Sequence, residues 1–306
     1  MPKRILITGA NGMLGREITD IFSKNKKYNV FGIIRSRKPK NPKVCFIIAD
    51  LRDIKSLKKI VSSVKPNIII HSAAIVNLDL CEQNKREADL LHIKATEILA
   101  SYKENKTKFV YISTDSVFNG KTGAYKESDR PDPLNYYAQS KLMGEKTAMA
   151  INKNSLVIRT NIYGFHVPPG NSLVEWALEN FTSKKSINGF TDVFFNPVYT
   201  RQLAKIIKYI LEKNDIKGIL NIGSEESMNK YEFLKSLASR FEAQTLIKPV
   251  LVNTSDLKTI RPKNTILDIN KLKKILGGKT LKISKGLSEL KKDYLKEIKK
   301  SKYEKN

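Results

Sequence analysis

A tyrosine and a lysine four residues apart are the strongest candidates for chemistry in this chain of 306 residues. Tyr137 and Lys141 lie in the run Tyr137-Ala138-Gln139-Ser140-Lys141, and this spacing puts both side chains on one face of a helix. A free phenol has a pKa of about 10 and transfers protons poorly at neutral pH, whereas a neighbouring ammonium favours the phenolate. The pair therefore predicts a tyrosine tuned for acid–base work.

A threonine at the end of a predicted strand adds a third group. Thr114 follows the run 109–113, in the stretch Tyr111-Ile112-Ser113-Thr114-Asp115. Open α/β sheets bind their ligands at the carboxyl ends of the strands, which is where this hydroxyl is expected. A single tyrosine–lysine pair is also common on ordinary helix surfaces. In this order, behind a glycine-rich turn, the three residues favour a catalytic site formed by Thr114, Tyr137 and Lys141.

Three regularly spaced glycines follow the first predicted strand. Gly9 permits a tight turn, Gly12 lets the backbone approach a pyrophosphate, and Gly15 allows a helix to pack closely. Amides at the start of that helix would face the phosphate charge. Because the turn joins a strand to a helix, the pattern favours dinucleotide binding over a plain strand-to-helix turn. The predicted contacts are Gly9, Asn11, Gly12, Met13 and Leu14.

The end of the second predicted strand indicates which dinucleotide. The acidic residue that would hold an NAD ribose is missing, and the chain continues with Arg35-Ser36-Arg37-Lys38. Because an arginine at this place accepts a 2′-phosphate, Arg35 favours NADP(H), with NAD(H) as the alternative. Asp50 and Leu51 follow the third strand and are predicted to contact the adenine edge. Asp53 could equally cap the next helix.

Short β-branched runs alternate with longer amphipathic stretches in the first half of the chain. The predicted strands are 3–8, 30–34, 44–49, 68–72, 109–113 and 156–159, and the predicted helices are 13–23, 54–64, 85–102 and 137–151. Several strand runs are apolar without alternation, as expected for strands that are buried on both faces. The alternation predicts an α/β fold with a Rossmann-type doubly wound parallel sheet.

Beyond residue 163 the alternation loosens, and Pro-bearing segments separate predicted helices at 172–182, 200–212, 230–241 and 284–299. We expect a cofactor-binding domain over residues 1–163, with the chain returning to the sheet around 187–223. Residues 164–306 are expected to form mainly a smaller, irregular substrate-binding lobe. The cleft between the two lobes is the expected ligand site.

The net charge of the chain bears on which kind of partner it could bind. There are 56 Lys+Arg against 30 Asp+Glu, a formal net charge of +26, which invites a nucleic-acid or membrane-surface interpretation. No nucleic-acid-binding motif accompanies the charge, and no run is long enough to span a bilayer. The lysine-rich surface is expected to attract anionic small molecules instead. Two cysteines and no signal peptide fit a reduced, cytoplasmic location, and no ligand cluster announces a metal site.

Several motifs along nearly the whole chain resemble those of the extended short-chain dehydrogenase/reductase family, most of all its dTDP-4-dehydrorhamnose reductase branch. The run Ser113-Thr114-Asp115-Ser116-Val117-Phe118 is the most specific of them. The others are the glycine turn 7–15, Asp50-Leu51-Arg52-Asp53, residues 66–74 and 135–141, Arg159-Thr160, and Arg261-Pro262-Lys263-Asn264.

The resemblance implies a mechanism. A nicotinamide would deliver hydride to a keto carbon of a nucleotide-linked deoxysugar while Tyr137 protonates the carbonyl oxygen. Lys141 would hold the nicotinamide ribose and lower the pKa of Tyr137, and Thr114 would donate a hydrogen bond to the developing oxyanion. The implied contacts under the cofactor are Ala73 and Ala74, and those with the substrate are Val76, Ser116, Asn161 and Arg261.

The chain departs from this family at three positions. Ser116 stands where the family commonly has Tyr, and Ile162 stands where it has Trp, both on the sugar side of the site. His92 stands where relatives often carry Asn. We expect His92 to be a packing residue, with a role in proton relay as the alternative. His71, at the end of the fourth strand, is expected to be structural.

Three other functions remain compatible with parts of the pattern. The first is a regulatory subunit that binds NADP and attaches to a partner enzyme without turnover, as one member of this branch does. The second is a sugar-nucleotide epimerase or dehydratase of the wider family. The third, nucleic-acid binding, rests on charge alone. A homo-oligomer is left open by the sequence.

Overall fold

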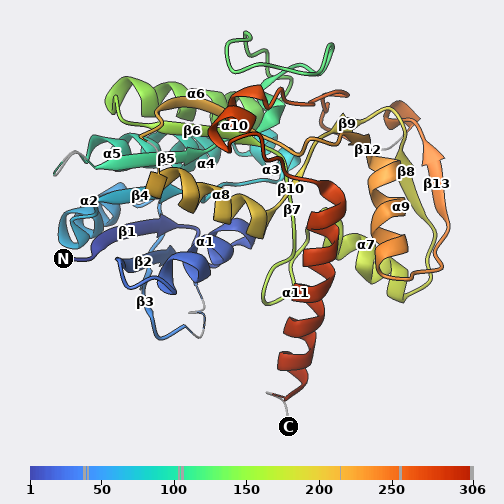
Figure 1. Ribbon diagram of the computed structural model, residues 1–306. Helices are drawn as coiled ribbons and strands as arrows, with labels where there is room; N and C mark the ends of the chain where they lie inside the picture. Colours follow the sequence, from blue (N-terminus) through green and yellow to red (C-terminus); the bar gives the residue numbers. More distant parts are fainter. Residues whose placement is uncertain are drawn as a thin grey trace.

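The fold is built on one parallel sheet of seven strands (Figure 1). The computed structural model describes residues 1–303 apart from 37, 38, 40, 103, 105, 106, 214, 255 and 256. The strand order is β11-β6-β5-β4-β1-β2-β3, and every neighbouring pair is parallel. The bounds are β1 Lys3–Thr8, β2 Tyr28–Ile34, β3 Val44–Ile48, β4 Ile68–His71, β5 Lys108–Ile112, β6 Leu156–Thr160 and β11 Gly218–Ile222.

Helices cover both faces of the sheet, which confirms the predicted doubly wound α/β class. One core lies under α1 (Met13–Ser23), α8 (Thr200–Lys213) and α10 (Asn270–Ile275). The other lies under α2 (Ile54–Val64), α5 (Ala95–Ser101) and α6 (Tyr136–Ile151). All four residues of β4 are buried, as a strand covered on both faces requires. Because all strands are parallel, the loops after β1 to β6 meet at one edge of the sheet.

A second lobe has its own aromatic core. It contains α7 (Leu173–Thr182), α9 (Lys230–Arg240), the pair β8 (Ile187–Phe190) and β13 (Ile247–Val250), and the pair β9 (Phe194–Phe195) and β12 (Met228–Asn229). The chain rejoins the large lobe only at β10 (Val198–Tyr199), which pairs with β7 (Ile162–Tyr163), followed by α8 and β11. The return predicted around 187–223 therefore starts later, because Ile187–Phe190 stays in the second lobe.

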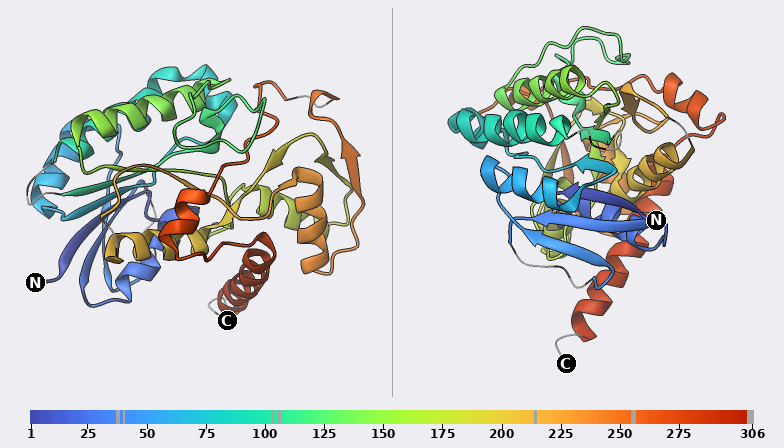
Figure 2. Two further views of the ribbon diagram at one scale, coloured as in Figure 1. Left: turned by 45° about the horizontal axis from the view of Figure 1, so that its top comes forward. Right: turned by 90° about the vertical axis from the view of Figure 1, so that its left-hand side faces the viewer.

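The last helix, α11 (Ile283–Tyr303), runs along the boundary between the lobes to the C-terminus (Figures 1 and 2). Its Asp293 forms an ion pair with Arg201 of α8, while its Lys291 pairs with Glu242, which follows α9. The helix thus contacts both lobes. Among the residues that the structure describes, no helix has the length and apolar character needed to cross a bilayer.

The predicted helix 85–102 is three segments in the structure. A π-helix, Leu90–Lys94, lies between α4 (Lys85–Asp89) and α5. Within this widened turn, the carbonyl of His92 accepts a hydrogen bond from Thr96 Oγ1 at 2.7 Å. A pattern search at the α-helical period cannot detect such a widened turn. The six-residue helices α3 (Leu78–Gln83) and α10 were also missed, since each is too short to establish a period.

A buried ion pair fixes α6 on the sheet. Arg159 of β6 donates from Nε and Nη2 to the Glu145 carboxylate at 3.0 and 2.7 Å, and Ser113 Oγ, just after β5, donates to the same carboxylate. The Glu145 and Arg159 side chains are 0% and 2% exposed. Glu145 follows Lys141 by one helical turn, so this contact sets where the predicted catalytic face of α6 meets the ends of β5 and β6.

Glu145→Gln is expected to lower the free energy of unfolding by about 3–5 kcal/mol, because it leaves the Arg159 charge buried without its partner. Urea denaturation of the purified protein measures the change. Glu97→Gln is the matched control, since it removes the exposed pair between Lys94 and Glu97 and should cost less than about 1 kcal/mol. Equal losses in the two variants would contradict this role of Glu145.

Candidate active site

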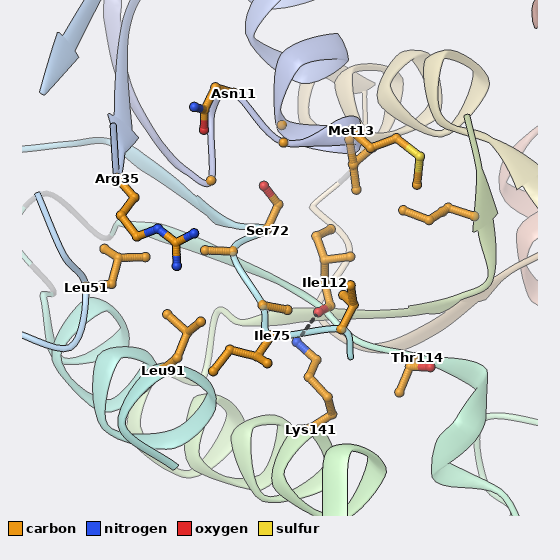
Figure 3. Close-up of a pocket in the computed structure, with 18 of the residues that line it drawn as sticks. Asn11, Met13, Arg35, Leu51, Ser72, Ile75, Leu91, Ile112, Thr114 and Lys141 are labelled. Carbon is orange, nitrogen blue, oxygen red and sulfur yellow. Dashed lines mark hydrogen bonds between the residues drawn. The ribbon is translucent and has the colours of Figure 1, made fainter. Parts of the chain in front are cut away.

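A cavity of about 720 Å³ lies at the carboxyl edge of the sheet (Figure 3). It extends from the glycine turn after β1 to the loops after β5 and β6, with α6 below. The structure brings to it the predicted catalytic residues Thr114, Tyr137 and Lys141 and every predicted cofactor contact. Of the predicted substrate contacts, Val76, Ser116 and Asn161 line the cavity, whereas Arg261 does not.

The glycine turn has the geometry that its spacing predicted. Gly9 has φ of +63°, and a Cβ there would lie 3.0 Å from the Cα of Ala73 on the neighbouring loop. A Cβ on Gly15 would lie 2.0 Å from the Gly9 carbonyl oxygen, so the first turn of α1 sits directly against the loop. Gly12 caps α1 without a side-chain hydrogen bond. The amino end of α1 therefore has no side-chain cap of its own, a feature of many anion-binding helix ends.

Arg35 and Leu51 lie together at the end of the cavity away from Thr114 (Figure 3). Arg35 is exposed and, with Arg52, helps to lower the pKa of Asp50; the main cause is hydrogen bonding from Arg52. The Asp50 carboxylate accepts from the backbone N–H and the Nε of Arg52, both at 2.9 Å. Asp53 caps α2 by accepting from Ser56 N, so its alternative role is the one observed. Arg37 and Lys38 lie outside the described residues.

Burial dominates the electrostatics of the tyrosine–lysine pair. Lys141 is 2% exposed and donates from Nζ to the carbonyl of Ile112 at 2.7 Å, while its ammonium lies 4.1 Å from the centre of the Tyr111 ring. Burial lowers the pKa of Lys141 to about 7, and Glu145 opposes the shift. Burial also holds the pKa of Tyr137 well above its usual value, and the nearby Thr114 hydroxyl offsets part of this rise. Lys141 is not among the groups that lower the pKa of Tyr137, and its Nζ donates to the carbonyl of Ile112.

Thr114 is held by a buried carboxylate that the sequence analysis did not single out. Thr114 Oγ1 donates to Asp115 Oδ1 at 3.2 Å and accepts from the backbone N–H of Ser116. The other carboxylate oxygen accepts from Asn161 Nδ2 at 2.9 Å and from Thr265 Oγ1. Burial raises the pKa of Asp115, and these donors counter the rise. Thr114, Ser116 and Asn161 therefore all contact the Asp115 carboxylate. The feature of the sequence that could have indicated it is an acidic residue between two hydroxyl residues.

The loop 166–172 forms a wall of the cavity that the sequence analysis also missed. Glu175 accepts hydrogen bonds from the backbone N–H groups of His166, Gly170 and Ser172 at 2.7–3.0 Å, and its Oε2 lies 2.7 Å from His166 Nδ1. Despite burial, these donors lower the pKa of Glu175 to about 2. The pattern of Ser172 followed by Glu175, a capping box at the start of α7, was the available signal.

Arg261 is the one predicted site residue that lies away from the cavity. Burial lowers the pKa of Arg261, and the charge of Asp79 in α3 raises it, so Arg261 lies near α3. Asn135, which caps α6, also donates to the carbonyl of Ile260 at 3.0 Å. In the described part of the chain, no three His, Cys, Asp or Glu side chains gather as a metal site would need.

Both histidines of the large lobe are buried beside Lys141 and stay neutral. Burial, with the charge of Lys141, lowers the pKa of His71 to about 3 and that of His92 to about 2. His71 Nδ1 lies 2.7 Å from Thr8 Oγ1, and its Nε2 lies 3.4 Å from the carbonyl of Leu91. His71 therefore joins β1 to the π-helix, in agreement with the structural role expected for it.

The family model and the relatives found among known proteins agree on one family. The family described as the RmlD substrate binding domain matches residues 3–296. The beta subunit of methionine adenosyltransferase 2 from Xenopus tropicalis is 31% identical over 296 residues, 94% of this chain and 86% of that protein. dTDP-4-dehydrorhamnose reductase from Aggregatibacter actinomycetemcomitans is 30% identical over 288 residues, 90% of this chain and 93% of that protein.

Among solved structures, dTDP-4-dehydrorhamnose reductase from Bacillus anthracis in complex with NADP matches with a TM-score of 0.82 and 25% identity. The match covers 96% of this chain and 100% of that one. The whole architecture, including the second lobe, is therefore shared with this reductase.

The lowered pKa of Lys141 predicts a pH dependence of stability. Between about pH 7 and 10, folded Lys141 has lost its proton while the unfolded lysine keeps it, so stability rises with pH. Relative to Lys141→Met, the wild-type protein should gain up to about 1.4 kcal/mol of unfolding free energy per pH unit over this range. Urea unfolding at several pH values measures the difference, with Lys146→Met, on the same helix, as the control. A difference that does not change with pH would contradict the prediction.

Proposed function

Since the chain belongs to the RmlD substrate binding domain family, in the dTDP-4-dehydrorhamnose reductase branch of the extended short-chain dehydrogenases/reductases, we propose that it is a reductase. Its substrate would be a nucleotide-linked 4-keto-6-deoxysugar and its reductant NADPH. The observation that carries the proposal is the meeting of Thr114, Tyr137 and Lys141 on the cavity that the glycine turn also lines.

The residues around the cavity fit a dinucleotide. The uncapped amino end of α1 at Gly12 suits the pyrophosphate, and the close approach of Gly9 to Ala73 gives the cavity a floor without bulky side chains. Arg35 suits a 2′-phosphate, with Leu51 beside it for the adenine. When bound, the nicotinamide supplies the hydride.

Tyr137 has the protonation state that a reduction needs. Its raised pKa keeps the phenol protonated at neutral pH, so Tyr137 carries a proton when the carbonyl needs one. Tyr137 would therefore give its proton to the carbonyl oxygen as negative charge develops there. Thr114 would turn its hydroxyl from Asp115 to that oxygen, and Lys141, with a pKa near 7, would help to restore the proton on Tyr137.

The sugar side of the cavity is polar. Ser116 and Asn161 are both oriented by Asp115, and His166 lies on the facing loop. Such groups are suited to hydrogen bonds with sugar hydroxyls. The smaller Ser116 and Ile162, in place of the aromatic residues common in the family, support a keto sugar other than the rhamnose precursor. Arg261 does not line the cavity; its proposed contact is with the part of the nucleotide that extends beyond the cavity.

Tyr137→Phe is expected to lower kcat by about 10²- to 10⁴-fold, because it removes the proton donor. NADPH consumption over a panel of nucleotide 4-ketosugars measures the rate. Tyr136→Phe is the matched control: its hydroxyl bonds to Asp89, away from the cavity, so kcat should stay close to that of the wild type. Unchanged turnover in Tyr137→Phe would show that another group is the acid.

Arg35→Ala is expected to weaken NADPH binding by about tenfold and leave NADH binding unchanged, because only NADPH carries the 2′-phosphate that the guanidinium would meet. Fluorescence titration with each nucleotide measures both dissociation constants, so NADH serves as the internal control. An equal loss for both nucleotides would place Arg35 away from the 2′-phosphate.

A second candidate function follows from the similarity to the beta subunit of methionine adenosyltransferase 2. The chain would then bind NADPH and attach to a partner enzyme without turnover. Tight NADPH binding with no consumption across the whole sugar panel would favour this candidate. A substrate converted with no net NADPH consumption, on a tightly retained oxidised cofactor, would favour an epimerase or dehydratase instead.

A further inference from the structure

The segment that connects β4 to α3 forms part of the cavity wall without strand pairing. Its partly buried peptide groups need other partners, because an unpaired backbone N–H away from water is costly. Thr8 Oγ1 accepts from the N–H of Ala73 at 3.3 Å. At Ile75, the N–H donates to His92 Nε2 at 3.0 Å, and the carbonyl accepts from Cys81 Sγ at 3.4 Å. Side chains thus hold this segment, and Ile75 is held on both sides.

The other ring nitrogen of His92 faces α6. His92 Nδ1 lies 2.8 Å from Ser140 Oγ, and Ser140 Oγ donates to the carbonyl of Tyr137 at 2.8 Å. Because Nε2 accepts from Ile75, Nδ1 must carry the ring proton and donate it to Ser140. The imidazole ring also lies edge-on to the Tyr137 ring, with centroids 5.9 Å apart. His92 is 0% exposed, so no solvent replaces any of these contacts.

The π-helix brings His92 into this position. A Cβ on Gly144 of α6 would lie 2.5 Å from the His92 carbonyl and 2.2 Å from Tyr111 Oη, so the glycine lets α6 approach the widened turn. This close approach puts the imidazole between α6 and the β4–α3 segment. Figure 3 shows Ile75 on the cavity wall, between Leu91 of the π-helix and Lys141 of α6.

We propose that His92 is a positioning residue, a neutral imidazole that hydrogen-bonds Ile75 on one side and Ser140 on the other. Through these two hydrogen bonds, His92 sets the distance between the β4–α3 segment and the face of α6 that carries Tyr137. A proton relay through the ring is not part of this role: Nε2 already accepts from a backbone amide, and its low pKa keeps it so. The inference about catalysis rests on the proposed reductase function; the inference about the wall does not.

Two substitutions separate the two sides of the ring. His92→Gln keeps an acceptor at the distance of Nε2 and loses the donor to Ser140. His92→Asn keeps a donor near the place of Nδ1 and loses the acceptor for Ile75. Amide hydrogen exchange over residues 73–77 and NADPH titration are measured for both variants. We expect faster exchange and about tenfold weaker NADPH binding in His92→Asn, with both close to wild type in His92→Gln.

Turnover supplies the third readout. His92→Gln should lower kcat several-fold at nearly unchanged KM, because Tyr137 loses its support through Ser140. The pH profile of kcat/KM should keep the same limbs as in the wild type, since the imidazole does not titrate. Three outcomes would overturn the proposal: loss of a limb near pH 6.5 in His92→Gln, equal exchange at 73–77 in both variants, or a lower thermal midpoint with exchange and NADPH affinity unchanged.

If wild-type protein consumes no NADPH with any sugar, the proposed function fails on its own. The exchange comparison still decides whether His92 holds Ile75, because it needs neither cofactor nor substrate. If one variant is too unstable to fold, the other variant still tests the hydrogen bond that it removes from the ring.

Discussion

The ion pair between Glu145 and Arg159 is the contact on which the site depends most. It holds α6 against β5 and β6, and Lys141 lies one turn from Glu145 on that helix. The same carboxylate opposes the loss of charge that burial imposes on Lys141. A buried pair of this kind adds little net stability compared with a well-packed apolar contact, but losing one partner is severe. Its value here is geometric, because it gives α6 one position relative to the sheet edge.

A second buried carboxylate connects the two lobes at the same edge. Asp115 follows β5, yet its oxygens accept from Asn161, which follows β6, and from Thr265, which lies in the segment after α9 and β13. Thr114, the predicted hydrogen-bond donor to the substrate, is bonded to this acceptor as well. The second lobe therefore affects the orientation of the group that would meet the reacting oxygen. Substitutions far along the chain, at Thr265 for example, act on the site through Asp115.

Local patterns in the sequence were sufficient for the longest strands and helices around the glycine turn. The bounds of β1, α1 and α2 agree with the predicted ranges to the residue, because each has a clear period and a clear turn at its ends. The widened turn at His92 was not predictable, since no α-helical period marks it and it packs against α6, far along the chain, at Gly144. The late return of the chain to the sheet was also missed. The sequence of Ile187–Phe190 does not indicate which strand it pairs with, and only its pairing with β13 assigns it to the second lobe.

The sequence by itself determined the α/β class, the glycine turn and the residues that could do chemistry, because these depend on residue type and on spacing within one or two elements. Only the tertiary structure decided how those residues are charged and held. Burial, not Lys141, sets the pKa of Tyr137, and Lys141 directs its ammonium to Ile112. Arg261, singled out by its motif, lies outside the cavity, while Asp115 and the loop 166–172 lie within its wall. Desolvation and hydrogen bonding between distant segments exist only once the chain is folded, so no local pattern could reveal them.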